Sequence, residues 1–374
     1  KRHGTDELVP FTAGRPAAPQ TRANSFNYVR TDTAVPWTAE ASACTAHARG
    51  AGLDPLRQLW LVEADRLTRH VTDTGDFTDA EITRGYLRLG AACLTTAFII
   101  TQRTGAYQRI AGSDNESVKE RLLPALVSGE SFATVGISHL TTSRRHLGRP
   151  VLRSRQVDDG FVLDGFSPWV TGADHASVIV TGAELDDGRQ ILVALPTDLP
   201  GVAVPPPPRL VGLSASHTGE VHLSGVRLSR EWLLAGPVEN VMKIGFGAGT
   251  GGLQTSTLAI GLASAAIDFL DAEAVKRPDL GGPAAELRRE HAELQSSLLA
   301  LAEGQTVCTN DELRARANSI VLRATQAALA AAKGTGYVVG HPAGRWCREA
   351  LFFLVWSCPQ GVMAANLCEL AGLD

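Results

Sequence analysis

The feature that most constrains the fold is a strand-like block of about a hundred residues set between two helical regions. From Ser131 to about Pro237, short apolar runs rich in β-branched residues alternate with turns such as Asp158-Asp159-Gly160. Such runs with Asp-Gly turns are typical of antiparallel strands. Because strands and helices are segregated along the chain, we expect a β domain packed against an α-helical body.

The region before the strand block has helical spacing. The strongest pattern runs from Asp79 to Arg109, where Thr78 precedes an acidic first turn and Ala91 to Ile100 is apolar on nearly all sides. A second helix is predicted from Glu116 to Val127. The fold class is therefore mainly α with a central antiparallel β domain.

Helical spacing returns after the strand block. The expected C-terminal four-helix bundle consists of Leu253–Leu270, Glu286–Ala302, Glu312–Ala332 and Arg348–Leu370, the last interrupted at Cys358-Pro359. The predicted organisation is an irregular segment over 1–50, a helical domain over 51–131, a middle β domain over 132–238 and a helical bundle over 239–374.

Composition argues against several classes of partner. The net charge of −4 provides no positive field for nucleic acid or an anionic membrane surface. No apolar run approaches the ~20 residues that span a bilayer, and the first residues lack a signal-peptide pattern. The cysteines form no CxxC pair and no zinc-like cluster, so we expect reduced thiols, no metal and a cytoplasmic location.

Six strings of residues, in order along roughly residues 55 to 374, resemble the acyl-CoA dehydrogenase family. They are Gly112-Ser113 with Lys119–Glu130, Gly136–Ser143, Asp159–Ala173, Gly212–Leu228, Arg277–Pro283 and Gly334–Tyr337. The resemblance implies an acyl-CoA dehydrogenase-like fold and a flavoprotein, usually with FAD, in a homodimer or homotetramer.

The resemblance also implies which residues contact the flavin. Trp169 and Thr171 would lie beside the isoalloxazine, Ser138 would contact the ring, and Ser143 would contact the pyrophosphate. An indole offers a flat apolar face to a flat ring, and hydroxyls offer hydrogen-bond donors to its oxygens. Without the family context, Trp169 is typical of a packed strand aromatic.

A second group of residues would reach the FAD of a neighbouring subunit. These are Arg277, Gly334 and Gly336, since arginine suits a diphosphate and glycine lets the backbone approach a nucleotide closely. Leu280 replaces the family's phenylalanine, which leaves FMN as the alternative cofactor.

The pattern departs from the family at the catalytic base. A dehydrogenase of this type needs a carboxylate to accept the proton next to the thioester carbonyl. The family's glutamate position near the C-terminus falls on Ser357, and Val355 to Ala365 contains no Asp or Glu. The other usual position lies near Gly251, and no carboxylate occurs between Asn240 and Ile267.

Three functional hypotheses remain. The first is a dehydrogenase-like flavoenzyme that acts on an acyl thioester of CoA or acyl carrier protein, with His139 or Glu349 as the base. The second is a monooxygenase that takes reduced flavin from a partner reductase, with Ser138, His139, Thr171 and Ser357 as hydrogen-bond donors. The third is a non-catalytic binding or assembly subunit. His139 and Ser357 are thus the candidate catalytic residues, although His139 also fits a histidine bonded to backbone.

Overall fold

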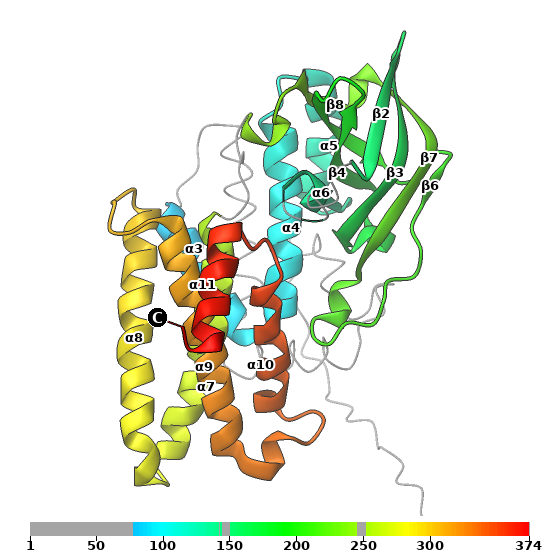
Figure 1. Ribbon diagram of the computed structural model, residues 1–374. Coiled ribbons are helices and arrows are strands. Elements are labelled where there is room, and N and C mark those ends of the chain that lie inside the picture. Colours follow the sequence, from blue (N-terminus) through cyan, green and yellow to red (C-terminus); the bar gives the residue numbers. More distant parts are fainter. Residues whose placement is uncertain (1–77, 142, 144–149, 245–251, 374) are drawn as a thin grey trace, which may run out of the picture.

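A computed structural model of the chain describes residues 78–141, 143, 150–244 and 252–373. The predicted irregular segment over 1–50 lies outside these residues. The C-terminal helices gather on one side of the molecule and the strands on the other, with α4 (Leu94–Ala111) running between them (Figure 1).

Three helices precede the sheet. They are α3 (Asp79–Ala92), α4 (Leu94–Ala111) and α5 (Glu116–Ser128). Thr78 caps α3 through its side chain, which accepts a hydrogen bond from the Glu81 backbone N–H, while the Glu81 carboxylate accepts one from the Thr78 backbone. This reciprocal capping satisfies two backbone donors and fixes where α3 begins.

The single helix predicted from Asp79 to Arg109 is in fact two helices. Cys93 has an extended backbone with φ −158° and ψ 100°, and its Sγ lies 3.1 Å from Thr96 Oγ1 at the start of α4. The break lets the two helices pack on different partners, because α3 packs along a bundle helix whereas α4 continues to the sheet (Figure 1).

The strands form one mixed sheet in the order β6-β7-β3-β2-β4-β5-β8, with β1 paired to β4. Their bounds are β1 Ala133–Gly136, β2 Leu152–Val157, β3 Gly160–Thr171, β4 Val178–Leu185, β5 Gln190–Pro196, β6 Val202–Ala203, β7 Thr218–Ser229 and β8 Leu233–Val238. Most pairs are antiparallel as predicted, but β1 and β2 both run parallel to β4. The short helix α6 (Ser138–Thr141) follows β1 directly.

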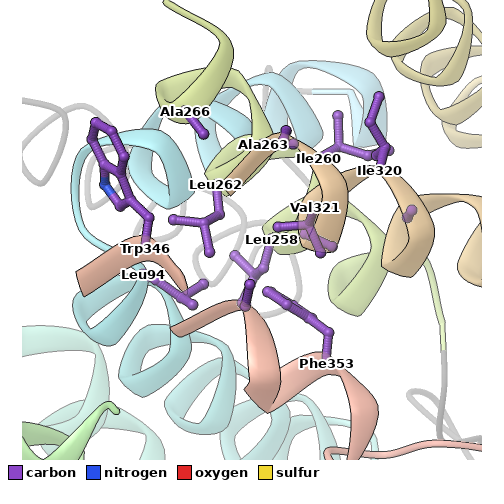
Figure 2. Packing of buried hydrophobic residues seen from close by; sticks show 14 of the residues in the cluster. Leu94, Leu258, Ile260, Leu262, Ala263, Ala266, Ile320, Val321, Trp346 and Phe353 are labelled. Carbon is purple, nitrogen blue, oxygen red and sulfur yellow. The ribbon is translucent and has the colours of Figure 1, made fainter. Parts of the chain in front are cut away.

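The C-terminal bundle begins with α7 (Leu253–Ala274). It continues with α8 (Gly281–Ala302), α9 (Asn310–Gly336, kinked at Lys333), α10 (Pro342–Ala350), the 3-10 turn η8 (Leu351–Leu354) and α11 (Gln360–Ala371). Side chains from α7, α9, α10 and η8 converge in a single core (Figure 2). By length and composition alone α7 could cross a bilayer, but 67% of that stretch is buried inside the protein, as expected of a core helix.

One helix takes part in two separate hydrophobic cores. The first half of α4 contributes Leu94, Ala97 and Phe98 to the bundle core. Its second half contributes Ala106, Tyr107 and Ile110 to the core between the helices and the sheet. The position of α4 therefore sets how the helical body and the sheet meet.

We predict that Gly261→Ala on α7 lowers the free energy of unfolding. A Cβ at this position would lie 2.6 Å from Leu87 O, which is backbone and cannot move without shifting α3. Overpacking of this kind costs about 1–3 kcal/mol. Denaturant unfolding with the two-state midpoint as readout would measure the loss.

The matched control is Gly281→Ala at the first position of α8, where an added Cβ meets nothing within 4 Å. Alanine favours helix over glycine by up to about 1 kcal/mol, so this variant should be unchanged or slightly more stable. Equal stability of the two variants would contradict the close α3–α7 contact.

Candidate functional site

A cavity of about 820 Å³ lies between the sheet and the helical body. Its wall contains residues from α3, α4, β1, β3, the β7 end of the sheet, α7 and the η8 region. This size is within the range of small-molecule and cofactor sites. The cavity is the candidate functional site because it brings together most of the residues singled out in the sequence.

One face of α4 forms part of the wall. The wall residues of α4 repeat with the helical period, so they share one side of the helix, and apart from Phe98 none of them belongs to either core. They are Phe98, Thr101, Gln102, Gly105, Gln108 and Arg109. Arg109 Nη1 donates to Gly105 O at 2.9 Å, and burial lowers the pKa of its guanidinium to about 10. Arg109 therefore keeps its positive charge at neutral pH.

The end of β1 carries Ser138 to the cavity. Gly136 packs so closely that a Cβ would lie 2.8 Å from Ser167 Oγ, and its carbonyl accepts hydrogen bonds from Ser167 and Thr181. The strand end is therefore held firmly. Ser138 Oγ is buried and has no hydrogen-bond partner among the described residues. A buried hydroxyl in this state is expected to bond to a ligand or water.

Trp169 and Thr171 reach the cavity from β3. Side chains alternate along a strand, so Val170 packs into the core on the other face of the sheet, while Trp169 and Thr171 line the cavity. The Trp169 side chain is 48% exposed, which makes it an open wall and not the packed strand aromatic of the alternative interpretation. Thr171 Oγ1 lies 3.0 Å from Thr218 Oγ1, which in turn lies 2.8 Å from Ser216 Oγ.

Ser357 reaches the same cavity from the end of the bundle. The neighbouring wall is aromatic: Phe352 and Trp356 are stacked at 4.8 Å, and Phe98 meets Trp356 edge-on at the same separation. Arg314 holds this segment, because its guanidinium donates to Trp356 O at 2.8 Å. Ser357 has φ 44°, a left-handed backbone that is uncommon outside glycine.

The structure does not bring the two proposed bases to the cavity wall. His139 lies on α6, where Nε2 donates to Gly182 O at 2.7 Å and burial lowers its pKa. This is the backbone-bonded arrangement considered from the sequence. Glu349 is buried, with Arg345 Nε 3.7 Å from its carboxylate. Neither residue is part of the wall.

Asp79 is the only carboxylate on the cavity wall among the residues that the structure describes. It is the first residue of α3 and is exposed. In the sequence, Asp79 was only a helix-start signal, and neither Asp79 nor Arg109 was predicted as a site residue. The one signal for Arg109 was the helical spacing of Thr101, Gln102 and Gly105 before it.

Ser143 also lines the cavity, so Ser138, Ser143, Trp169, Thr171 and Ser357 come together. Arg277, Gly334 and Gly336 do not line it. Arg277 Nη2 donates to Ala331 O at 2.7 Å and pairs with Glu273. The place near Gly251 considered for a base lies outside the described residues.

Comparison with curated proteins finds acyl-CoA dehydrogenases. The probable acyl-CoA dehydrogenase YngJ of Bacillus subtilis is 31% identical over 173 residues, which cover 45% of this chain and 45% of that protein. Mouse short-chain specific acyl-CoA dehydrogenase is 24% identical over 284 residues, covering 70% of this chain and 68% of that protein. No family model matches the chain.

Comparison with solved structures confirms the predicted fold class. Butyryl-CoA dehydrogenase from Megasphaera elsdenii superposes with a TM-score of 0.70 at 17% identity, covering 96% of this chain and 100% of that one. An acyl-CoA dehydrogenase from Bacillus anthracis complexed with FAD superposes with a TM-score of 0.68 at 17% identity, covering 88% of this chain and 65% of that one. The prolyl acyl carrier protein oxidase AnaB superposes with a TM-score of 0.66 at 15% identity, covering 80% of this chain and 85% of that one.

We predict that His139→Gln weakens the dependence of stability on acid pH. Because burial lowers the pKa of His139, the folded protein binds fewer protons than the unfolded chain once the pH falls below about 6.5. Stability should therefore fall as the pH is lowered from about 7 to 5, and less steeply in the variant. His291, whose pKa burial also lowers, should account for part of the remaining slope. Unfolding midpoints across this range would measure the effect, and an unchanged slope would contradict it.

Proposed function

Because the chain is related in sequence to the acyl-CoA dehydrogenases and has their fold, we propose that it is a flavin-dependent oxidoreductase. In this proposal FAD binds in the cavity between the sheet and the helical body, and the substrate is an acyl thioester. The observation that carries the proposal is the pairing of an open indole, Trp169, with the unpartnered buried hydroxyl of Ser138 on one wall.

The donors on the wall fit a flavin. Trp169 offers a flat apolar surface for a flat ring, and the hydroxyls of Ser138 and Thr171 are hydrogen-bond donors for its polar edge. Arg109 supplies a fixed positive charge that favours an anionic or electron-rich ligand. When bound, FAD would supply the acceptor for two electrons.

The acyl part of the substrate has an apolar surface available in the same cavity. Ile82 and Tyr86 of α3 line it together with Phe98, Phe352 and Trp356. Apolar side chains of this kind bind an acyl chain through the hydrophobic effect and exclude water from the reacting carbons. A CoA thioester and a carrier-protein thioester present the same acyl group, so both belong to the proposed substrate class.

Asp79 is the candidate proton acceptor. Oxidation next to a thioester carbonyl requires a base for the proton on the adjacent carbon, and the resemblance to the family places Ser357 where a glutamate is expected. Among the described residues, Asp79 is the carboxylate of the wall. We therefore assign the proton to a carboxylate oxygen of Asp79 when substrate is bound.

The proposed function can be tested with purified protein. Its ultraviolet–visible spectrum, with mass identification of any released chromophore, tests flavin binding and distinguishes FAD from FMN. Anaerobic bleaching on addition of short- and medium-chain acyl-CoA thioesters would support dehydrogenation. Flavin turnover that needs a reductase and oxygen would support oxygenation instead, and a protein that takes up no flavin would overturn the proposal.

We predict that Trp169→Ala weakens flavin retention. Loss of the indole removes one face of the flavin site, which is worth about 1–3 kcal/mol for a stacked base-like ring, or roughly 5- to 150-fold in Kd. Flavin fluorescence during titration of the apoprotein would measure Kd. Trp232→Ala is the matched control, since Trp232 packs under Arg121 away from the cavity. An equal effect of both changes would count against flavin contact by Trp169.

We predict that Asp79→Asn abolishes thioester-driven bleaching but leaves flavin binding intact. The amide keeps the size of the side chain and removes its basicity, so the rate should fall by at least about a hundredfold. Stopped-flow reduction without oxygen would measure the rate. Asp279→Asn, at an exposed carboxylate away from the cavity, is the control. Wild-type bleaching in Asp79→Asn would exclude this residue as the base while leaving the flavin proposal in place.

A further inference from the structure

Two short turns meet at one end of the β3–β7 strand pair. The turn η3 (Ala173–His175) follows β3, and the turn η4 (Ser214–Ser216) precedes β7. The pairing of Thr171 with Thr218 places them side by side, and Gly172 N donates to Ser216 O at 3.0 Å. Three side chains with metal-binding chemistry gather at this junction.

Asp174 and His175 come from the first turn, and His217 lies between η4 and β7. Asp174 Oδ2 lies 2.7 Å from His217 Nδ1 and 3.6 Å from His175 Nε2. The three potential ligand atoms all lie within 4.8 Å of one another. In a tetrahedral site with bonds of about 2.1 Å, neighbouring ligand atoms are about 3.4 Å apart. The 2.7 Å separation is shorter than this value because it is a hydrogen bond, so an ion would replace that hydrogen bond and the two atoms would move apart.

A second observation points to a ligand at this cluster. His175 Nε2 is buried and has no hydrogen-bond partner among the described residues. The side chains of Asp174, His175 and His217 remain 30%, 26% and 15% exposed, so the cluster lies close to solvent. The backbone of His217 is left-handed, with φ 49°, at the residue whose ring belongs to the cluster.

We propose that Asp174, His175 and His217 bind a divalent transition-metal ion of the Zn²⁺ class. Two imidazoles and one carboxylate are a donor set that such ions prefer, and three protein ligands leave at least one position for water. The sequence spacing gave no sign of this site, because His217 is distant in the chain and only the strand pairing brings it to the other two.

The site would act on the cavity wall without taking part in the redox chemistry. Thr171 lies two residues before Ala173, and Ser216 and Thr218 flank His217; all three polar residues line the cavity. An ion bound to both turns would join the two segments that carry these hydroxyls. The proposed metal site is independent of flavin binding, because this chain supplies all three ligand side chains and the site requires no cofactor.

The test uses the untagged full chain after treatment with EDTA and gel filtration. Titration with Co²⁺, followed by visible absorbance, and with Zn²⁺, followed by calorimetry, should give one ion per chain and a rise in Tm. His175→Ala and His217→Ala should each weaken the affinity at least about tenfold. His222→Ala is the control, because His222 lies on the neighbouring strand β7, is exposed and is outside the cluster.

Asp174→Asn separates metal binding from a hydrogen-bonded pair that only stabilises the turns. The amide oxygen can still accept from His217 but carries no charge, so the metal-free Tm should change little while metal affinity falls at least about tenfold. No ion bound at one equivalent, or equal binding by the cluster variants and His222→Ala, would overturn the proposal. Loss of flavin binding without loss of metal binding would leave it standing.

Discussion

The rest of the structure depends on the burial of α4 in two hydrophobic cores at once. Its first half packs with the bundle and its second half packs with α5 and the sheet, so it cannot rotate without breaking both. Close-packed interiors tolerate little movement of this kind. The third face of the helix, with Thr101, Gln102 and Arg109, is thereby held on the cavity wall. The helix joins the two halves of the molecule and also builds the site between them.

The chemistry of the cavity follows from which charges are present on its wall. Arg109 remains protonated despite burial, since its lowered pKa of about 10 is still well above neutrality. Arg348 also lines the wall and donates to Gly344 O, and Asp79 stands at the start of α3. The remaining polar groups there are largely hydroxyls and amides. Such a wall offers positive charge to an anionic group and apolar surface to a flat ring and an acyl chain.

Several site residues could be predicted because a local string carried them. Trp169 and Thr171 stand in one strand segment, and Ser138 and Ser143 stand in another, so each pair could be recognised without knowing the fold. Asp79 could not, because its place on the cavity wall depends on where the start of α3 lies in the fold. His139 shows the opposite case: it follows Ser138 in the chain, but the turn of α6 sends its ring to Gly182 O and away from the wall. The direction of a side chain in so short a helix is decided by its neighbours in space.

The order of helices, strand block and helices was determined by the sequence itself, because hydrophobic period and turn residues act over a few positions. The sequence alone also showed that no Asp or Glu lies close to Ser357 along the chain, from Val355 to Ala365. Only the tertiary structure decided the break at Cys93, the parallel pairing of β1 with β4, and the meeting of Asp174 with His217. Each of these joins segments that are distant in the chain or pack on different partners. Packing between such segments is a property of the whole fold, which no local pattern contains.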